Sequence, residues 1–177
     1  MNRCCKWETC VIWASSTANI NCTNPRHQFA AQDHTSCSAF NSYSTNNNIH
    51  LKASSGYQYI KSPYYPNKYP SNIQCTWVIS ASSSSERIKL TITDVKIQNY
   101  YSICSSTADT LTIRDGSSQY STQLKEVCST SYSSSTVTST GQKLWIQFKT
   151  NSDNYFGSSS EAGFQGKFIE IESSSSK

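Results

Sequence analysis

The sequence predicts an all-β fold, an antiparallel β-sandwich of the jelly-roll kind with a short disulfide-rich N-terminal extension. Three observations support this fold class. Three of the four prolines in the 177-residue chain fall within residues 62–77, later segments alternate apolar and polar residues, and the eight cysteines form an even set. From about residue 56 onward, no segment has the apolar period of a convincing amphipathic helix.

The proline-rich segment, residues 62–77, predicts a rigid turn that leads into a strand. Each proline fixes its own φ and removes a backbone donor, and the residue before it is biased toward extended geometry. Helix is therefore excluded here, and a buried central strand is disfavoured. We expect Tyr64, Tyr65 and Tyr69 to brace the turn.

Three later segments show a period of two, which is typical of strands with one buried and one solvated face. Serine-rich stretches between the periodic segments predict turns. We expect Trp77 and Trp145 in the core. The residues expected to face the core in the three segments are Ile88, Leu90 and Ile92, then Leu144, Ile146 and Phe148, then Phe164 and Phe168 on either side of Gly166.

These features occur in an order that resembles the CUB domain family. Residues 62–77 are similar to its Ser-Pro, Tyr-Pro and Cys-x-Trp signature, and residues 109–116 to its Asp-x-Leu-x-Ile-x-Asp-Gly run. Gly163-Phe164 resembles the Gly-Phe before the family's last strand. The resemblance divides the chain into a Cys-rich extension, a CUB domain and a Ser-rich tail, at residues 1–46, 47–172 and 173–177.

The even number of cysteines indicates disulfides and an oxidising compartment, because no pair has the spacing of a structural zinc site. The resemblance implies a Cys104–Cys128 disulfide and makes Cys75 the second cysteine of another. The usual partner of Cys75, near residue 47, is missing from the sequence, so we expect Cys37 to take its place. The remaining cysteines, which would pair among themselves, are Cys4, Cys5, Cys10 and Cys22.

The expected location is secreted or extracellular. Asn21 begins the one glycosylation sequon, Asn-Cys-Thr. Residues 1–8 do not resemble a signal peptide, and no stretch has membrane-spanning length, so we infer a fragment, a mature form or an incomplete reading. A scattered net charge of +4 argues against nucleic acid as a partner.

No combination of residues predicts an enzyme. The histidines lie in the extension or at its end, and the adjacent Asp33 and His34 do not give the geometry of a Ser-His-Asp triad. The sequence has neither a phosphate-binding Gly-Lys-Ser loop nor a His-Glu-x-x-His zinc motif. We therefore expect a non-catalytic protein that needs no cofactor.

Many CUB domains bind calcium at one end of the sandwich, so the resemblance implies candidate ligands. Only Asp109 matches the family's acidic pattern, since Gln98 and Asn151 place amides at the other two positions. Each carboxylate that is replaced by an amide weakens the attraction for the ion. Calcium is thus the alternative to the interpretation that we favour, in which Asp109 caps a turn or accepts backbone hydrogen bonds. The candidate ligands are Gln98, Asp109, Asn151 and Asp153.

The same loops suggest a binding site, because residues 98–101 and 151–157 would meet at one end of a CUB sandwich. Rigid aromatic rings among amides suit a glycan or protein surface, or alternatively anchor the loops on the core edge. We expect a secreted recognition module that binds an extracellular glycan or protein here. One alternative is a structural protein of the extracellular matrix or of a secreted adhesive. The other is a non-catalytic portion of a larger secreted protease. The candidate contact residues are Asn99, Tyr100, Tyr101, Tyr155 and Phe156.

Overall fold

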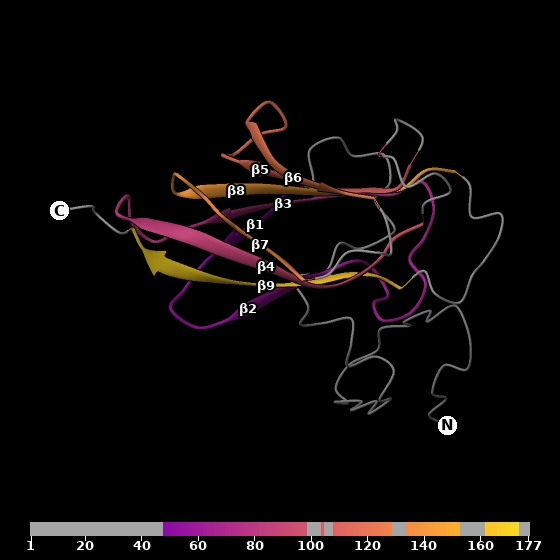
Figure 1. Ribbon diagram of the computed structural model, residues 1–177, viewed down its shortest axis with the longest axis horizontal. Helices are drawn as coiled ribbons and strands as arrows, with labels where there is room; N and C mark the ends of the chain where they lie inside the picture. The colour runs from indigo at the N-terminus through magenta and orange to yellow at the C-terminus, as the bar shows by residue number, and fades with distance from the viewer. Residues whose placement is uncertain (1–47, 99–103, 105–107, 129–133, 153–161, 174–177) are drawn as a thin grey trace, which may run out of the picture. The chain divides into compact units, whose positions relative to one another are not determined.

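The computed structural model describes residues 48–98, 104, 108–128, 134–152 and 162–173, which form strands and connecting turns with no helix among them. In Figure 1 the strands lie in two layers, which confirms the all-β sandwich. None of the described segments is a helix that is long and apolar enough to cross a membrane. The strands are β1 (Asn48–Lys52), β2 (Gln58–Lys61), β3 (Gln74–Ser80), β4 (Glu86–Lys96), β5 (Thr110–Asp115), β6 (Thr122–Val127), β7 (Ser135–Thr138), β8 (Lys143–Lys149) and β9 (Gly163–Glu172).

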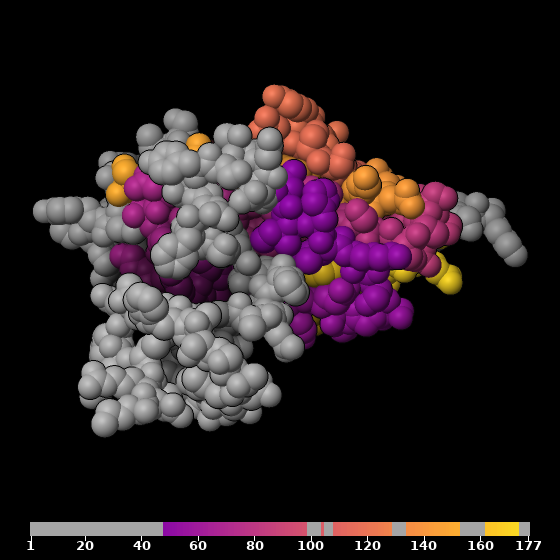
Figure 2. All heavy atoms as spheres, turned by 180° about the vertical axis from the view of Figure 1, so that it is seen from behind, coloured from indigo at the N-terminus to yellow at the C-terminus, as the bar shows by residue number. Residues whose placement is uncertain are grey.

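The two sheets contain five and four of these strands. The five-stranded sheet has the order β1-β3-β8-β5-β6, and the four-stranded sheet has the order β2-β9-β4-β7. The chain therefore crosses repeatedly from one layer to the other. Strands β1 and β3 pair in parallel, whereas the other neighbours are antiparallel. The turn between β5 and β6 projects from the sandwich (Figures 1 and 2).

The core lies between the sheets and contains the alternating residues that the sequence predicted. Every one of the predicted apolar positions in β4, β8 and β9 is buried in this core, as is Trp77. Trp145 is also buried, but it lies between the inward-facing Leu144 and Ile146 and is not part of the core cluster. Aromatic rings from opposite sheets meet edge to face: Phe164 lies 5.7 Å from Trp77 and 5.4 Å from Phe148 between ring centroids. Such arrangements are favoured by the quadrupoles of the rings and add to the energy of apolar burial.

The Ser-Pro and Gly-Phe motifs contact each other where β2 ends and β9 begins. The Ser62 N–H donates to the Phe164 carbonyl at 3.0 Å, and the Phe164 N–H donates to Ser62 Oγ at 3.0 Å. Gly163 has a φ of +84°, and a Cβ at this position would overlap Ser62 Oγ and lie 2.7 Å from Ser62 Cβ. Both the backbone conformation and the contact therefore require glycine.

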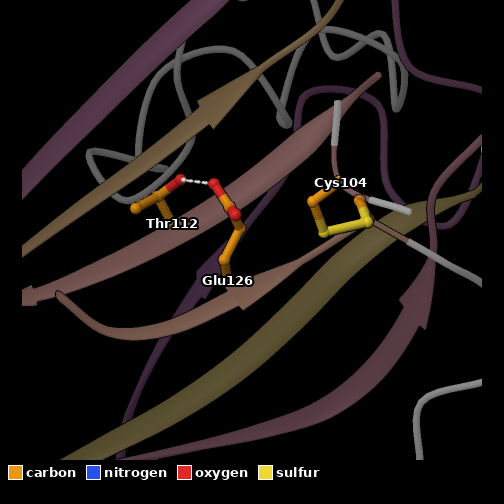
Figure 3. Close-up of a disulfide and its surroundings, with 4 residues drawn as sticks. Cys104, Thr112 and Glu126 are labelled. Atoms are coloured by element: carbon orange, nitrogen blue, oxygen red, sulfur yellow. Dashed lines mark hydrogen bonds between the residues drawn. A yellow bond between two sulfur atoms is a disulfide. The ribbon is translucent and has the colours of Figure 1, made fainter. Parts of the chain in front are cut away.

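The Cys104–Cys128 disulfide is present, with the two Cα atoms 5.4 Å apart (Figure 3). It lies near a cross-strand pair of β5 and β6, in which the Thr112 hydroxyl is 3.5 Å from the Glu126 carboxylate. A clip over a sequence separation of 24 residues stabilises a domain by roughly 3 kcal/mol on the chain-entropy estimate. This pair confirms the disulfide that the resemblance implied.

Cys75 is buried in β3 and is also disulfide-bonded. Its partner lies outside the described residues, so the pairing with Cys37 stays a prediction. The same holds for the glycosylation of Asn21 and for the pairing of the other cysteines in the extension, Cys4, Cys5, Cys10 and Cys22.

We expect Gly163→Ala to lower the free energy of unfolding by about 2–4 kcal/mol, because it adds a clash to a strained φ. Gly141→Ala is the matched control, since a Cβ there meets no atom within 4 Å, and it should change stability by no more than about 0.5 kcal/mol. Chemical denaturation of both variants measures the difference. Equal stabilities would contradict the proposed need for glycine.

Candidate binding site at the loop end of the sandwich

Asp109 lies directly before β5 and is the buried centre of the loop end. Its carboxylate accepts the Tyr69 hydroxyl at Oδ2, 2.7 Å away, and the Asn151 backbone N–H at Oδ1, also 2.7 Å away. The side chain is 1% exposed, so these charge-assisted bonds replace the water that burial removed. Asp109 thereby ties the proline-rich turn to the segment that follows β8.

Tyr69 connects this carboxylate to the end of β4. Its hydroxyl donates to Asp109 and accepts the Gln98 backbone N–H at 2.8 Å. The ring is 1% exposed and packs edge-on against Phe148, with the centroids 5.1 Å apart. One side chain therefore fixes the relative positions of three segments and also fills the core.

The proline-rich turn is fastened to the end of β8 by a second set of hydrogen bonds. Thr150 Oγ1 donates to the Pro70 carbonyl and accepts the Ile73 N–H, each at 3.0 Å. The Asn72 N–H donates to the Asn151 carbonyl at 2.8 Å, with Asn72 at a positive φ of 54°. These bonds hold the described start of the 151–157 loop in a defined position.

The three tyrosines of the turn have different roles. Tyr69 is buried, and Tyr65 donates its hydroxyl to Asp94 Oδ2 at 2.9 Å. Partial burial raises the pKa of Tyr65, and the hydrogen bond to Asp94 and the negative charge of Asp94 raise it further. The Tyr64 side chain is 54% exposed, so its ring does not brace the turn as we expected.

Gln98 contributes an unpaired buried oxygen to the same region. The side chain is 7% exposed, and its Oε1 atom has no hydrogen-bond partner among the described residues. A buried acceptor without a partner costs about 1–3 kcal/mol. Gln98 Oε1 could therefore accept a hydrogen bond from a bound ligand at the loop end.

The described residues do not by themselves fit a calcium ion. They contain no group of three or more His, Cys, Asp or Glu side chains that could hold a metal. Both Asp109 oxygens already accept hydrogen bonds, whereas calcium takes six to eight oxygen ligands. Of the remaining candidates, Gln98 offers one amide oxygen, Asn151 binds Asp109 through its backbone, and Asp153 lies outside the described residues.

The structure brings together the described ends of the two candidate binding loops. Gln98 and Asn151 are both bonded to the Tyr69–Asp109 pair, which places the starts of the two loops beside each other. Sequence reasoning singled out Asp109 but missed its bond with Tyr69, since the pair is separated by 40 residues. The predicted contact residues themselves lie outside the described part of the chain: Asn99, Tyr100, Tyr101, Tyr155 and Phe156.

Tyr69→Phe should lower the free energy of unfolding by about 1–3 kcal/mol, because it leaves a buried carboxylate oxygen and a buried N–H without their partner. Tyr120→Phe is the matched control, since Tyr120 is 88% exposed and its change should stay within about 0.5 kcal/mol. Thermal unfolding of the two variants provides the comparison. A Tyr69→Phe variant as stable as the control would show that the hydroxyl does not organise the loop end.

Comparison with known proteins agrees with this architecture. A family model described as the CUB domain matches residues 47–168. Human "Signal peptide, CUB and EGF-like domain-containing protein 2" is 36% identical over 111 residues, which is 63% of this chain and 10% of that protein. Dog cubilin is 39% identical over 93 residues, or 51% of this chain and 2% of cubilin. The chain thus spans only a small part of these relatives.

Solved structures show the same fold at lower sequence identity. The CUB1-EGF-CUB2 domains of rat MASP-1 match with a TM-score of 0.57 at 20% identity, covering 70% of this chain and 42% of that one. The extracellular region of zebrafish Gpr126/Adgrg6 matches with a TM-score of 0.55 at 22% identity, covering 71% and 15%. Since the family model covers most of the sequence, this chain belongs to the CUB domain family.

Proposed function

We propose that the protein is a secreted, non-catalytic CUB-type recognition module that binds an extracellular glycan or protein through residues 98–101 and 151–157. The observation that carries this proposal is the fastening of both loop starts, at Gln98 and Asn151, to the buried Tyr69–Asp109 pair. Fixing the starts of the two loops in advance lowers the conformational entropy that the described backbone at Gln98 and Asn151 would lose on binding. A rigid scaffold that positions variable loops is a common design for recognition.

Two further observations support an extracellular role. A structural disulfide such as Cys104–Cys128 is typical of proteins in an oxidising compartment. The name of the human relative includes a signal peptide, and the matching zebrafish structure is an extracellular region. The candidate contact residues, Asn99, Tyr100, Tyr101, Tyr155 and Phe156, are aromatic or amide side chains that suit sugar rings and protein surfaces.

A glycan array with the complete secreted chain tests the proposal. We expect binding that is lost in the double variant Tyr100→Ala/Tyr155→Ala and retained in Tyr120→Ala, which removes an exposed tyrosine elsewhere. Sedimentation velocity on the same material distinguishes the structural alternative. No bound glycan, together with self-assembly that increases with concentration, would favour a matrix or adhesive protein instead.

We further propose that this function does not require calcium, because Asp109 is already satisfied by Tyr69 and Asn151. The midpoint of thermal unfolding should be the same in millimolar calcium as in a chelator. An ion at a hundred times its dissociation constant would stabilise the protein by roughly 2.7 kcal/mol, which is easily detected. A rise in the midpoint with calcium but not with magnesium would contradict the proposal.

A further inference from the structure

The outer face of the four-stranded sheet carries a line of basic side chains. In β9 the side chains of Phe164 and Phe168 point into the core, so that of Lys167 points outward. In β4 the inward positions include Ile88 and Leu90, and Lys89 lies between them on the outer face. The described outer face has five basic residues, of which Lys96 lies beside Asp94. We call the other four, Lys61, Arg87, Lys89 and Lys167, the basic line.

Strand register places these residues next to one another. Lys61 pairs with Gln165, two residues before Lys167, and Lys167 pairs with Thr91, two residues after Lys89. Diagonal neighbours on one face of an antiparallel pair lie about 7–8 Å apart. Arg87 follows on the same strand, about 7 Å beyond Lys89. The basic line therefore crosses β2, β9 and β4 diagonally with a nearly even spacing.

Carboxylates are scarce on the same face. Asp94 is the acidic residue of the described outer face, and it lies at the bulged end of β4, bonded to Tyr65 and 3.7 Å from Lys96. Arg87 donates to the carbonyls of Ser84 and Glu86 and not to a carboxylate among the described contacts. Lys61 already takes part in another interaction, so the positive charge at the centre comes from Lys89 and Lys167.

The glutamates near the end of β4 and β9 do not neutralise this face. Glu170 pairs with the inward-facing Ile88, and Glu172 pairs with Glu86 at the next position of the same parity. Glu170 is bonded to Ser82, in the turn that follows β3 of the other sheet. The three carboxylates therefore lie on the side of the four-stranded sheet opposite to the basic line.

Hydroxyl groups and aromatic rings surround the basic line. Tyr57 and Tyr59 are 56% and 49% exposed, and the Lys167 Nζ atom lies 4.6 Å from the centroid of the Tyr57 ring. Tyr59 pairs with Lys167 across the strands. On the other side, the hydroxyls of Thr91 and Thr136 are 2.9 Å apart. The face thus offers cations, neutral hydrogen-bonding groups and ring surfaces together.

We propose that this face binds a linear anionic polysaccharide, at a site distinct from the loop end. Sulfate or carboxylate groups along such a chain would form charge-assisted bonds with the evenly spaced lysines and arginine. The threonine hydroxyls would accept hydrogen bonds from or donate them to sugar hydroxyls, and the two exposed tyrosines would contact sugar rings. An acidic peptide would bind the cations, but its carboxylate side chains would make fewer contacts than a polysaccharide with the hydroxyls and rings of this face.

Heparin, as the anionic polysaccharide, is the probe for a direct test with the full secreted chain. The double variant Lys89→Gln/Lys167→Gln removes two charges from the basic line. Lys143→Gln/Lys149→Gln removes the same number of charges from exposed positions of β8 in the other sheet. The four lysines that are changed in the two variants are solvent-accessible, so we expect both variants to fold. Unfolding midpoints that match that of the wild type would establish this.

We expect wild-type protein to bind heparin at an ionic strength of about 0.15 M. The Lys89→Gln/Lys167→Gln variant should bind about tenfold more weakly and with a shallower salt dependence. The β8 control should stay within about twofold of wild type. No wild-type binding, or an equal loss in both variants, would overturn the site, because the attraction would then be absent or due to net charge alone.

Competition assays distinguish the polysaccharide from other polyanions. Desulfated heparin, which keeps only its carboxylates, should compete more weakly than heparin because it carries fewer anionic groups. Poly-glutamate and duplex DNA at equal charge concentration should compete at least tenfold less well than heparin. Equal competition by poly-glutamate or by DNA would overturn the assignment of a polysaccharide in favour of a peptide or a nucleic acid.

Discussion

A buried hydrogen bond between Tyr69 and Asp109 organises the end of the sandwich from which the candidate binding loops emerge. Tyr69 belongs to the turn that leads from β2 in the four-stranded sheet to β3 in the five-stranded sheet. Asp109 precedes β5, so the bond joins this turn to the start of another strand of the five-stranded sheet. The carboxylate is nearly inaccessible to water, which means that only its protein partners can compensate its charge. Gln98 and Asn151 attach to this pair through backbone N–H groups. Both loop starts are thus attached to the same side-chain contact, and a second set of hydrogen bonds, from Asn72 and Thr150, holds the start of the 151–157 loop.

The long strands could be predicted from the sequence because burial of one sheet face imposes a period of two on the side chains. In β4, which has 11 residues, Ile88, Leu90 and Ile92 make that period visible. Strand β1 was missed because its five residues contain only Ile49 and Leu51 as half-buried apolar positions. Its parallel pairing with β3 also depends on a crossover through the other sheet, which no local pattern records.

The candidate site was predictable only in part, because its contacts join residues that are distant in sequence. Asp109 was recognised from a family motif, but its partners Tyr69 and Asn151 lie 40 and 42 residues away. The Ser-Pro and Gly-Phe motifs were recognised separately, whereas the structure shows that Ser62 and Phe164 bond each other across 102 residues. A motif records which residue types occur and leaves out which of them touch. The basic line could not be predicted from the sequence for the same reason, since only strand register places Lys89 beside Lys167.

The two proposed binding surfaces can act independently because different interactions hold them in place. At the loop end, position is set by buried polar bonds, so a change in Tyr69 or Asp109 moves the chain itself. On the outer face of the four-stranded sheet, Lys89 and Lys167 alternate with the buried Leu90 and Phe168, which fix the backbone by apolar packing. A lysine there can lose its charge while its inward neighbours keep the strand in place. Selection can therefore alter the charge of this face without disturbing the loops, and the loops without disturbing the charge.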